Sequence, residues 1–432
     1  MLTKRRAALG FIFVTALLDM LAFGIAAPTL PKLISDFLGG NTARASEYLG
    51  FFITTFALVQ FFFSPVLGLI SDRFGRRPVI LLSNFGLAVD YAIMALAPSL
   101  NWLFLGRALA GLSASSIPTA AAYISDVTEP EKRSKGFGLL GAAFGVGFVI
   151  GPAIGGWLGQ HDPRLPFWVA AAASLLNACY GFFVLPESLA PEKRHLHFQW
   201  KKANPLGSLK LLRRHTELLG LATVNFLGDV AHEVYLTVWI LYVIYRFDWD
   251  QRMVGMGLAV VGIFSIVCSA ALVGPSVAKF GERRALLAGL LCGALGFAMY
   301  GWASSATMFF AAIAVNSLWS LARPTSQALM TRRVSASEQG ELQGAIASIR
   351  GIGMIIGPQI FAVTFAYFIA PEHKMPGAPW YLAALLLVAS FAIALAVAKD
   401  TKRDLGNHED KDDGSGKDTI SGGLANVEVE IG

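Results

Sequence analysis

The sequence predicts an all-α integral membrane protein in which twelve membrane-spanning helices form two pseudo-symmetric halves of six helices each. Of its 432 residues, 55% are hydrophobic and only 15% are charged, well below the roughly 25% charged share of a soluble domain. Apolar runs recur along the whole chain, and at about 20 residues each is long enough to cross a hydrocarbon core. A glycine pattern in the first half, Gly145-Val-Gly147-Phe-Val-Ile-Gly151-Pro152, returns in the second half as Gly351-Ile-Gly353-Met-Ile-Ile-Gly357-Pro358.

The apolar runs divide the chain into four parts. Residues 1–186 are predicted to form the N-terminal half, 187–215 a basic cytoplasmic linker, 216–398 the C-terminal half, and 399–432 a polar, acidic tail that we expect to be disordered. The twelve spans begin near Ala7, Tyr48, Val79, Trp102, Lys135, Pro166, Glu217, Arg252, Arg283, Ala306, Glu338 and Pro379.

The repeated glycine pattern does not predict a nucleotide site, because it has no preceding strand, no βαβ unit and no acidic residue beyond it. In a membrane helix, such glycines let a neighbouring backbone approach closely, and the final Gly-Pro removes a hydrogen bond and permits a bend. We expect both stretches to pack tightly and to flex as gating elements. Close packing alone is the alternative.

Basic residues predict the orientation. Most of the 35 lysines and arginines fall in segments that are cytoplasmic if both termini lie inside, as the positive-inside rule requires. The net charge of +6 is therefore a topology signal for a multi-pass protein of the cell (inner) membrane, and nucleic acid is not an expected partner. The basic start of the chain resembles a signal peptide, but eleven further spans identify it as the first retained helix.

No metal or cofactor is expected. Cys179, Cys268 and Cys292 lie in apolar spans at unrelated spacings, which predict neither a disulfide framework nor a metal site. His195 and His197 alternate like metal ligands but belong to a basic, exposed linker.

Polar side chains within the first-half spans are the candidate functional residues, because a charge in the membrane is costly and usually faces a partner or a transport path. Asp19 lies in the first span, Gln60 in the second, Asp90 and Tyr91 in the third, and Arg107 in the fourth. A buried arginine stays charged and needs an acceptor. Asp90 and Asp19 are both candidates for that role.

A short loop between the second and third spans reads Gly68-Leu-Ile-Ser-Asp72-Arg73-Phe-Gly75-Arg76-Arg77-Pro78. We expect Asp72 to cap the following helix and the three arginines to reach nearby carboxylates. Asp126, Glu129 and Glu131, at the inner end of the fourth span, are predicted either to be solvated or to contact the basic loops.

The seventh span carries the densest polar cluster. Asp229, His232 and Glu233 share one helical face by their spacing, which suggests proton handling; packing, or a position nearer the inner surface, is the alternative. The later spans add the polar or aromatic residues Ser265, Ser269, Asn316, Trp319, Ser320, Arg323 and Arg350.

Together these motifs resemble the major facilitator superfamily, and Leu18-Asp19, Pro28-Thr-Leu-Pro31, Asp90-Tyr91, Leu105-Gly106-Arg107 and Gly151-Pro152-Ala-Ile-Gly155-Gly156 resemble its bacterial tetracycline/proton antiporters. The resemblance implies the major facilitator fold. It also implies that Asp19 and Asp90 exchange protons or substrate, Gln60 lines the path, Arg107 assists proton transfer, and Asp72 and Arg76 lock the cytoplasmic side.

The second half departs from that branch. Ser265 and Ser269 stand where the resemblance implies a histidine and a glutamine, and Gly293 where it implies an aspartate. We hypothesise that Asp229 or Glu233, with His232, supplies the missing titratable role, and that Tyr91, Ser265, Ser269, Asn316 and Trp319 join Gln60 in binding substrate.

The leading hypothesis is a proton-coupled exporter of a small amphiphilic drug, able to function as a monomer. Import of a metabolite by symport is the alternative. A transport-inactive sensor or an enzyme is a third class, which the lack of a nucleophile, metal or nucleotide pattern disfavours.

Overall fold

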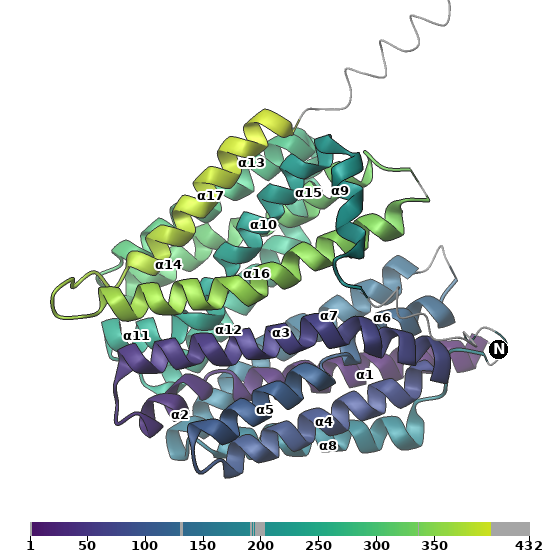
Figure 1. Ribbon diagram of the computed structural model, residues 1–432, viewed down its shortest axis with the longest axis horizontal. Coiled ribbons are helices and arrows are strands. Elements are labelled where there is room, and N and C mark those ends of the chain that lie inside the picture. Colours follow the sequence, from purple (N-terminus) through teal and green to yellow (C-terminus); the bar gives the residue numbers. More distant parts are fainter. Residues whose placement is uncertain are drawn as a thin grey trace, which may run out of the picture.

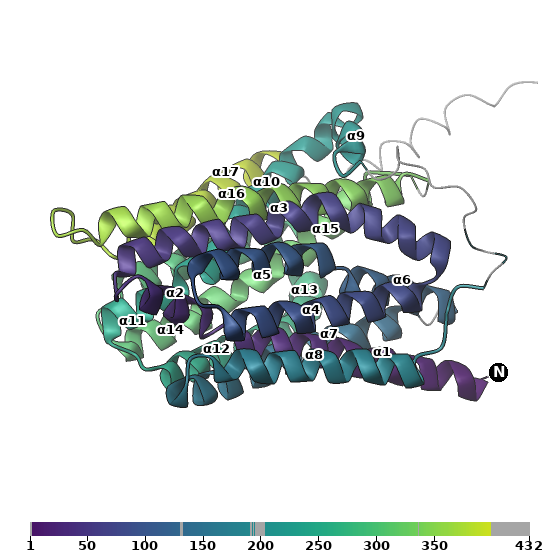
Figure 2. The ribbon, with the colours of Figure 1, turned by 60° about the horizontal axis from the view of Figure 1, so that its bottom comes forward.

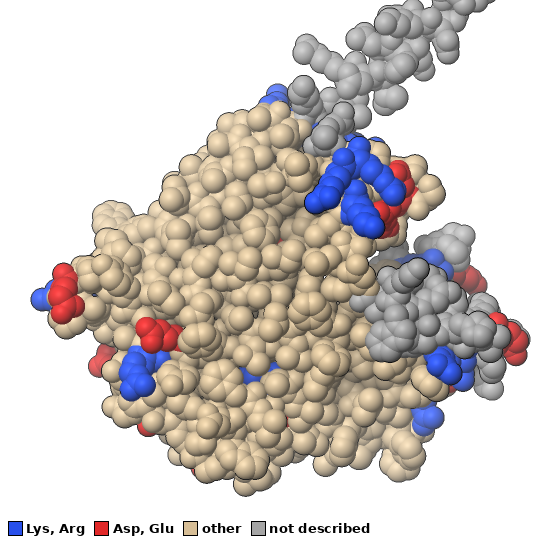
Figure 3. All heavy atoms as spheres, viewed as in Figure 1, with Lys and Arg blue, Asp and Glu red and all other residues tan. Residues whose placement is uncertain are grey.

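The computed structural model describes residues 2–129, 133–190, 192, 194, 204–335 and 337–398. The predictions made for Glu131, for His195 and His197, and for the tail from residue 399 lie outside these residues. Every regular element in the described part is a helix, and the predicted all-α membrane fold is confirmed. Charged side chains gather at the two ends of the molecule in Figure 3, and the surface between them is almost free of charge, as expected for a face in contact with lipid.

The first-half elements are α1 (Leu2–Ala26), α2 (Leu30–Phe37), α3 (Thr42–Phe74), α4 (Arg76–Leu96), α5 (Leu100–Ser113), α6 (Ser116–Val127), α7 (Arg133–His161) and α8 (Leu165–Val184). The second-half elements are η4 (Gly207–Leu209), α9 (Lys210–Arg214), α10 (Thr216–Thr237), α11 (Trp239–Phe247), α12 (Gln251–Val267), the π-helical η5 (Cys268–Leu272), α13 (Val273–Trp302), α14 (Ala306–Ser317), η6 (Leu318–Leu321), α15 (Ala322–Thr331), α16 (Gln339–Phe368) and α17 (Ala378–Val397).

Nine helices in the described residues are long and apolar enough to cross a membrane, or ten if the bent pair α10 and α11 is one span. The predicted fourth span is broken between α5 and α6, each of which is too short to qualify alone. The predicted eighth and ninth spans run on from 251 to 302, with non-helical backbone at Gly281. The count of twelve stays a prediction.

Each glycine-rich helix lies between one helix of its own half and one of the other. Helix α7 packs against α1 and α12, and α16 packs against α10 and α3. Figures 1 and 2 both show α16 running alongside α3, with the rest of each half on either side. Helices α7 and α16 therefore each contact both a polar-residue-bearing helix of their own half, α1 or α10, and a helix of the other half.

Corresponding glycines of α7 and α16 pack against corresponding positions of α1 and α10. A methyl group on Gly147 would lie 2.6 Å from Cβ of Met20, and one on Gly353 would lie 3.3 Å from Cβ of Asp229. One helical turn further, a methyl on Gly151 would meet the α carbon of Gly24 at 2.7 Å. The predicted close packing is present; bending at these positions stays a prediction.

The same turn of α16 packs against a carboxylate-bearing side chain. A methyl on Gly357, the repeat position of Gly151, would lie 2.7 Å from Cγ of Glu233. Asp229 and Glu233 thus occupy the places on α10 that Met20 and Gly24 occupy on α1.

Hydrogen bonds between the halves lie toward the end that carries α2 and α11, the predicted outer end. Ser46 donates to the carbonyl of Ala362 at 3.0 Å, and Gln160 donates to Asp250 at 2.8 Å. Near the latter bond, a methyl on Gly156 would lie 2.9 Å from the α carbon of Gly255. The halves are therefore in close contact at this end.

The described end of the linker is fixed to α16. The Ser348 hydroxyl donates to the Pro205 carbonyl. His215 and Glu338, the residues preceding α10 and α16, approach to 3.1 Å between Nε2 and Oε1. Residues 204–215 therefore pack with the second half.

Candidate functional site

Asp19 is the buried carboxylate of the first helix. It lies in α1 with 5% of its surface exposed and accepts a hydrogen bond from the Ser116 hydroxyl. Ser116 is the first residue of α6, just after the break that follows α5, and Gln60 donates to the Ala114 carbonyl in that break at 3.3 Å. The interrupted fourth span therefore supplies a hydroxyl to Asp19 and a carbonyl to Gln60.

Asp90 and Arg107 form a buried ion pair. Asp90 is fully buried, and its Oδ2 lies 2.6 Å from Nη2 of Arg107. The guanidinium also contacts the Met94 sulfur at 3.0 Å and lies over the Phe56 ring at 5.9 Å. Gly106 makes room for the pair, since a methyl there would lie 2.7 Å from Oδ1 of Asp90. The sequence left Asp90 and Asp19 as candidate acceptors for Arg107, and the structure shows that Arg107 binds Asp90.

Asp229 and Glu233 share one side of α10, as their spacing predicted. The structure shows that this side faces α16. Asp229 Oδ1 lies 3.1 Å from Nη1 of Arg323, whose side chain is 50% exposed. Glu233 is 3% exposed. Within the described residues, Asp229 Oδ2 and Glu233 Oε2 have no hydrogen-bond partner, so each carboxylate keeps one oxygen free for a proton or a ligand.

His232 is exposed and lies among aromatic rings. Its ring centroid is 5.7 Å from that of Tyr235 and 5.9 Å from that of Trp319. The three polar residues of α10 are thus adjacent, but the imidazole faces Trp319 whereas the two carboxylates face α16.

Two residues predicted to bind substrate are buried in helix contacts. Tyr91 and Asn316 are each 4% exposed. The Asn316 amide donates to the Gly293 carbonyl at 3.1 Å and accepts from the Tyr235 hydroxyl. In this conformation Asn316 joins α10, α13 and α14, so a substrate contact would require the helices to move.

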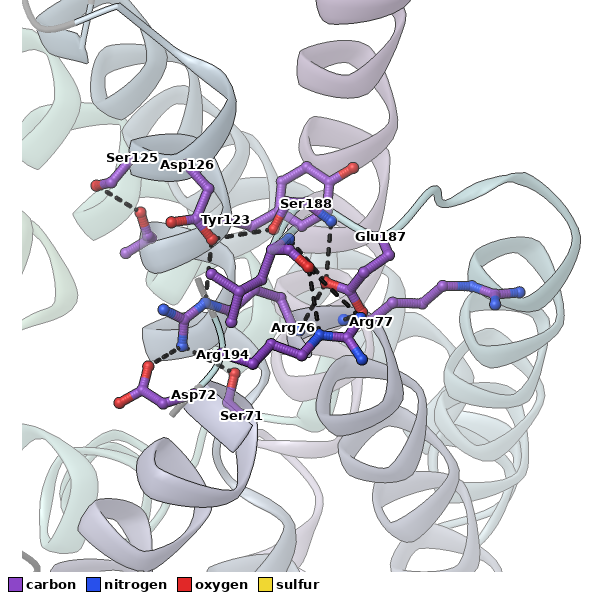
Figure 4. Close-up of polar contacts among 12 residues, drawn as sticks. Ser71, Asp72, Arg76, Arg77, Tyr123, Ser125, Asp126, Glu187, Ser188 and Arg194 are labelled. Carbon is purple, nitrogen blue, oxygen red and sulfur yellow. Dashed lines mark hydrogen bonds and ion pairs between the residues drawn. The ribbon is translucent and has the colours of Figure 1, made fainter. Parts of the chain in front are cut away.

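Arg76 is the centre of a polar network at the predicted cytoplasmic end (Figure 4). Its guanidinium contacts Oδ1 of Asp72 at 2.5 Å, Oδ2 of Asp126 at 3.1 Å and the Ser71 hydroxyl at 3.1 Å. The prediction that Asp126 contacts the basic loop is confirmed. This network joins the ends of α3, α4 and α6.

Glu187, which sequence reasoning missed, caps α4. Its carboxylate accepts from the backbone N–H groups of Arg76 at 2.8 Å and Arg77 at 3.2 Å, as Figure 4 shows. The predicted cap by Asp72 is wrong, because Asp72 is bound to the Arg76 side chain. The signal for Glu187 was its place directly after the sixth apolar run, where a carboxylate can meet the positive end of a neighbouring helix.

Gly75 permits this cap. Its φ is +109°, a backbone angle that residues other than glycine rarely adopt. A methyl at this position would lie 2.1 Å from Oε2 of Glu187. Among the other predicted gating residues of the loop, Gly68 and the side chains of Arg73 and Arg77 take no part in this cap. A methyl on Gly68 would have no neighbour within 4 Å, Arg73 lies over the Phe74 ring, and Arg77 lies over the Phe182 ring.

The second half repeats this corner with its charges reversed. Gly281, the repeat position of Gly75, also has a positive φ of +79°. Glu282 and Arg332, the repeat positions of Arg76 and Asp126, form an ion pair of 2.7 Å. The acid and the base have exchanged places between the halves.

Comparison with known proteins gives one consistent answer. The model of the Major Facilitator Superfamily matches residues 12–358 and 221–425. The chain belongs to the Major Facilitator Superfamily. It is 37% identical over 383 residues to the class C tetracycline resistance protein of Escherichia coli, covering 89% of this chain and 95% of that protein.

Solved transporters of the superfamily share the fold. The human organic anion transporter MFSD10 (TETRAN) aligns with a TM-score of 0.68 at 24% identity, covering 90% of this chain and 99% of that one. The nucleoside transporter NupG aligns with a TM-score of 0.75 at 13% identity, covering 91% and 100%. These likenesses show the shared fold, and the family match together with the long apolar helices identifies a multi-pass membrane protein of the superfamily.

The structure gives a physical reason for the glycine at residue 293, where the sequence resemblance implies an aspartate. A methyl on Gly293 would lie 2.8 Å from the Trp319 ring and 2.7 Å from Leu387. The indole thus fills the space that an aspartate side chain would need. Ser265 is half-buried, and Ser269 is exposed within the π-helical turn η5.

Proposed function

We propose that this chain is a proton-coupled exporter that exchanges protons for a small amphiphilic, drug-like compound, either tetracycline-like or drawn from a wider range of drugs. Its similarity to several proteins named as tetracycline resistance proteins supports the direction of transport and the compound class. The observation that carries proton coupling is Asp19, a buried carboxylate that accepts a hydrogen bond from one uncharged hydroxyl, that of Ser116.

Competition at Asp19 would couple the two fluxes. A proton and a cationic or polar group of the substrate can each satisfy the carboxylate, but both cannot occupy it at once. Rocking of one half against the other then exposes the carboxylate alternately to the two sides of the membrane. The close contact of the halves at the predicted outer end supports a resting state open toward the cytoplasm.

The contacts of the other polar residues in the spans and loops suggest a role for each in the proposed transport cycle. The Asp90–Arg107 pair is placed to respond when Asp19 changes its charge, and Asp229, His232 and Glu233 are the second-half candidates for a further proton. The network around Arg76 is the proposed cytoplasmic lock. The proposed location is the cell inner membrane with both termini inside, and a single chain supplies both halves.

Inverted membrane vesicles test the proposal. Addition of tetracycline, or of other amphiphilic drugs in a panel, should release protons from energised vesicles that contain the wild-type chain. Asp19→Asn should abolish that release. Asp36→Asn, at an exposed aspartate paired with Lys32 on α2, is the matched control and should leave it intact. Undiminished release with Asp19→Asn contradicts the proposal, and entry of proton and drug in the same direction would indicate an importer.

The second-half role needs its own variants. Asp229→Asn, His232→Gln and Glu233→Gln should each be measured in the same vesicles. We expect at least one to reduce proton release severalfold. Unchanged pH-driven transport in all three would remove the second half from proton coupling.

A further inference from the structure

Arg350 is a membrane-embedded arginine without an ion pair. It lies in α16, well inside the helix, and its side chain is exposed. Within the described residues it makes no hydrogen bond or ion pair, although its guanidinium carries five donors and a permanent charge. A charge in this position is costly unless something pairs with it. Arg350 therefore keeps its hydrogen-bond donors available for an anion.

The position of Arg350 is toward the protein interior and not toward lipid. It precedes Gly353 by three residues, so both lie on the face of α16 that packs against α10. The charges of Arg323, Asp229 and Glu233 all act on it. The next residue, Gly351, packs against the Phe61 ring of α3, since a methyl there would lie 2.4 Å from that ring. Arg350 is thus at the boundary between the halves.

The accessible groups around Arg350 are cationic, and the acidic groups lie behind them. The Arg323 side chain is 50% exposed and that of Asp229 is 10% exposed. Glu233 is 3% exposed. An incoming ligand therefore meets two guanidinium groups first, while the buried carboxylates balance their charge.

An apolar surface adjoins these cations. Trp319 is half-buried and lies on the same helical stretch as Arg323, one turn earlier. Its indole packs against the exposed His232 ring at 5.9 Å between centroids. Aromatic rings beside arginines suit a ligand with a flat apolar body and an acidic edge, because arginine binds planar oxyanions through paired N–H groups.

We propose that Arg350 and Arg323 form an anion subsite that binds the acidic group of the transported compound, a carboxylate, sulfonate or ionised enol, with its apolar body against Trp319. This inference rests on the proposed export of amphiphilic drugs and restricts the cargo to compounds that carry an anionic oxygen group. A cationic group on the same compound remains free to compete with the proton at Asp19.

Two fluorescent probes with one shared body test the subsite. Anilinonaphthalene sulfonate carries an acidic group, and N-phenylnaphthylamine has the same rings without it. Binding of each would be titrated on the full-length chain in lipid nanodiscs, as wild type, Arg350→Gln, Arg350→Lys and Arg252→Gln. The last variant removes an exposed arginine at the predicted outer end and is the matched control.

The expected result is selective. Arg350→Gln should weaken sulfonate binding about tenfold, the value of one charge-assisted contact, and change binding of the neutral probe less than about twofold. Arg350→Lys should fall between wild type and Arg350→Gln, and Arg252→Gln should match wild type. Thermal unfolding of each variant checks that the fold is retained.

Other outcomes would overturn the subsite. Equal weakening of both probes, or no weakening of either, would show that Arg350 does not read an acidic group. If the probes bind as in wild type while substrate-dependent proton release falls, Arg350 pairs with Asp229 or Glu233 in another conformation instead. Proton release by the wild type is measured separately, so loss of the subsite leaves the proposed export standing, and absent release with intact selective binding would refute export alone.

Discussion

The two halves of the molecule build the same contact between a glycine-rich helix and its neighbour, but they fill it with different side chains. In the first half, Gly151 of α7 meets Gly24, whereas in the second half Gly357 of α16 meets Glu233. The backbone frame is common to both, so the chemistry at the contact is free to differ. The first half instead places its ion pair between α4 and α5, where Arg107 binds Asp90.

The ion pairs Asp90–Arg107 and Asp229–Arg323, both within membrane spans, differ in how exposed their side chains are. The Arg107 side chain is 13% exposed and Asp90 is fully buried, whereas Arg323 is 50% exposed beside Asp229. A buried pair is isolated from water, so losing one partner strands the other. An accessible pair can exchange its partner for water or a ligand. The first half therefore has a fixed pair and the second half an exchangeable one.

The largest expected effect on stability tests this difference between the two ion pairs. Asp90→Asn should destabilise the protein by about 3–5 kcal/mol, because it leaves a buried Arg107 without a counter-charge. Asp229→Asn should cost less than about 1 kcal/mol, because water can reach Arg323. Denaturant unfolding in detergent, followed by tryptophan fluorescence, measures both. Equal losses would mean that the two pairs are equivalent.

The next effect tests the glycine contact. Gly155→Ala should destabilise by about 1–3 kcal/mol through overpacking, since its methyl would lie 2.1 Å from the Ile25 carbonyl oxygen. Gly138→Ala on the same helix has no atom within 4 Å of its methyl and should be neutral or stabilising by up to about 1 kcal/mol. The repeat position of Gly155 holds the buried Phe361, so the requirement for a small residue here belongs to the first half. A loss of stability with Gly138→Ala would contradict the argument.

An effect of similar size compares the two predicted cytoplasmic corners. Gly75→Ala and Gly281→Ala should each cost about 1–3 kcal/mol, because both backbones occupy a glycine-only region. Gly75→Ala should be the worse of the two, since only its methyl would displace the Glu187 cap. The midpoint of thermal unfolding ranks the variants. A lower midpoint for Gly281→Ala than for Gly75→Ala would show that the cap contributes little.

The smallest effect concerns pH at the start of α16, outside the membrane spans. Hydrogen bonds from the Ser335 hydroxyl and from His215 lower the pKa of Glu338 to about 2, from an ordinary 4.5. A lowered acid pKa stabilises the fold above the ordinary value, and that contribution is lost as pH falls from 4.5 toward 2. Glu338→Gln should therefore flatten the acid limb of a stability profile and leave its slope near neutral pH unchanged. Identical acid limbs for the variant and the wild type would contradict this.

Sequence reasoning succeeded where one helix or one repeat contained the information. The apolar runs predicted most helices, and the repeat predicted the glycine contacts. The spacing of Asp229, His232 and Glu233 predicted one shared face, which holds for the two carboxylates, whereas the His232 ring faces Trp319. It failed where two distant segments meet. The Glu187 cap on α4, the choice of Asp90 for Arg107, and the Asn316 contact with Gly293 depend on which helices are neighbours, and periodicity does not encode that. The break that places Ser116 beside Asp19 was also missed, although Pro118 in the first turn of α6 has no N–H to bond the Ala114 carbonyl and so marks it.

Trp319 and Gly293 are linked by sharing one volume. An aspartate introduced at residue 293 alone would collide with the indole, and a smaller residue introduced at 319 alone would leave a void. Each single change is therefore unfavourable, and the effects of substitutions at residues 293 and 319 should not be additive. A change of side-chain volume at either position would have to be matched at the other, so we expect the two residues to vary together among relatives.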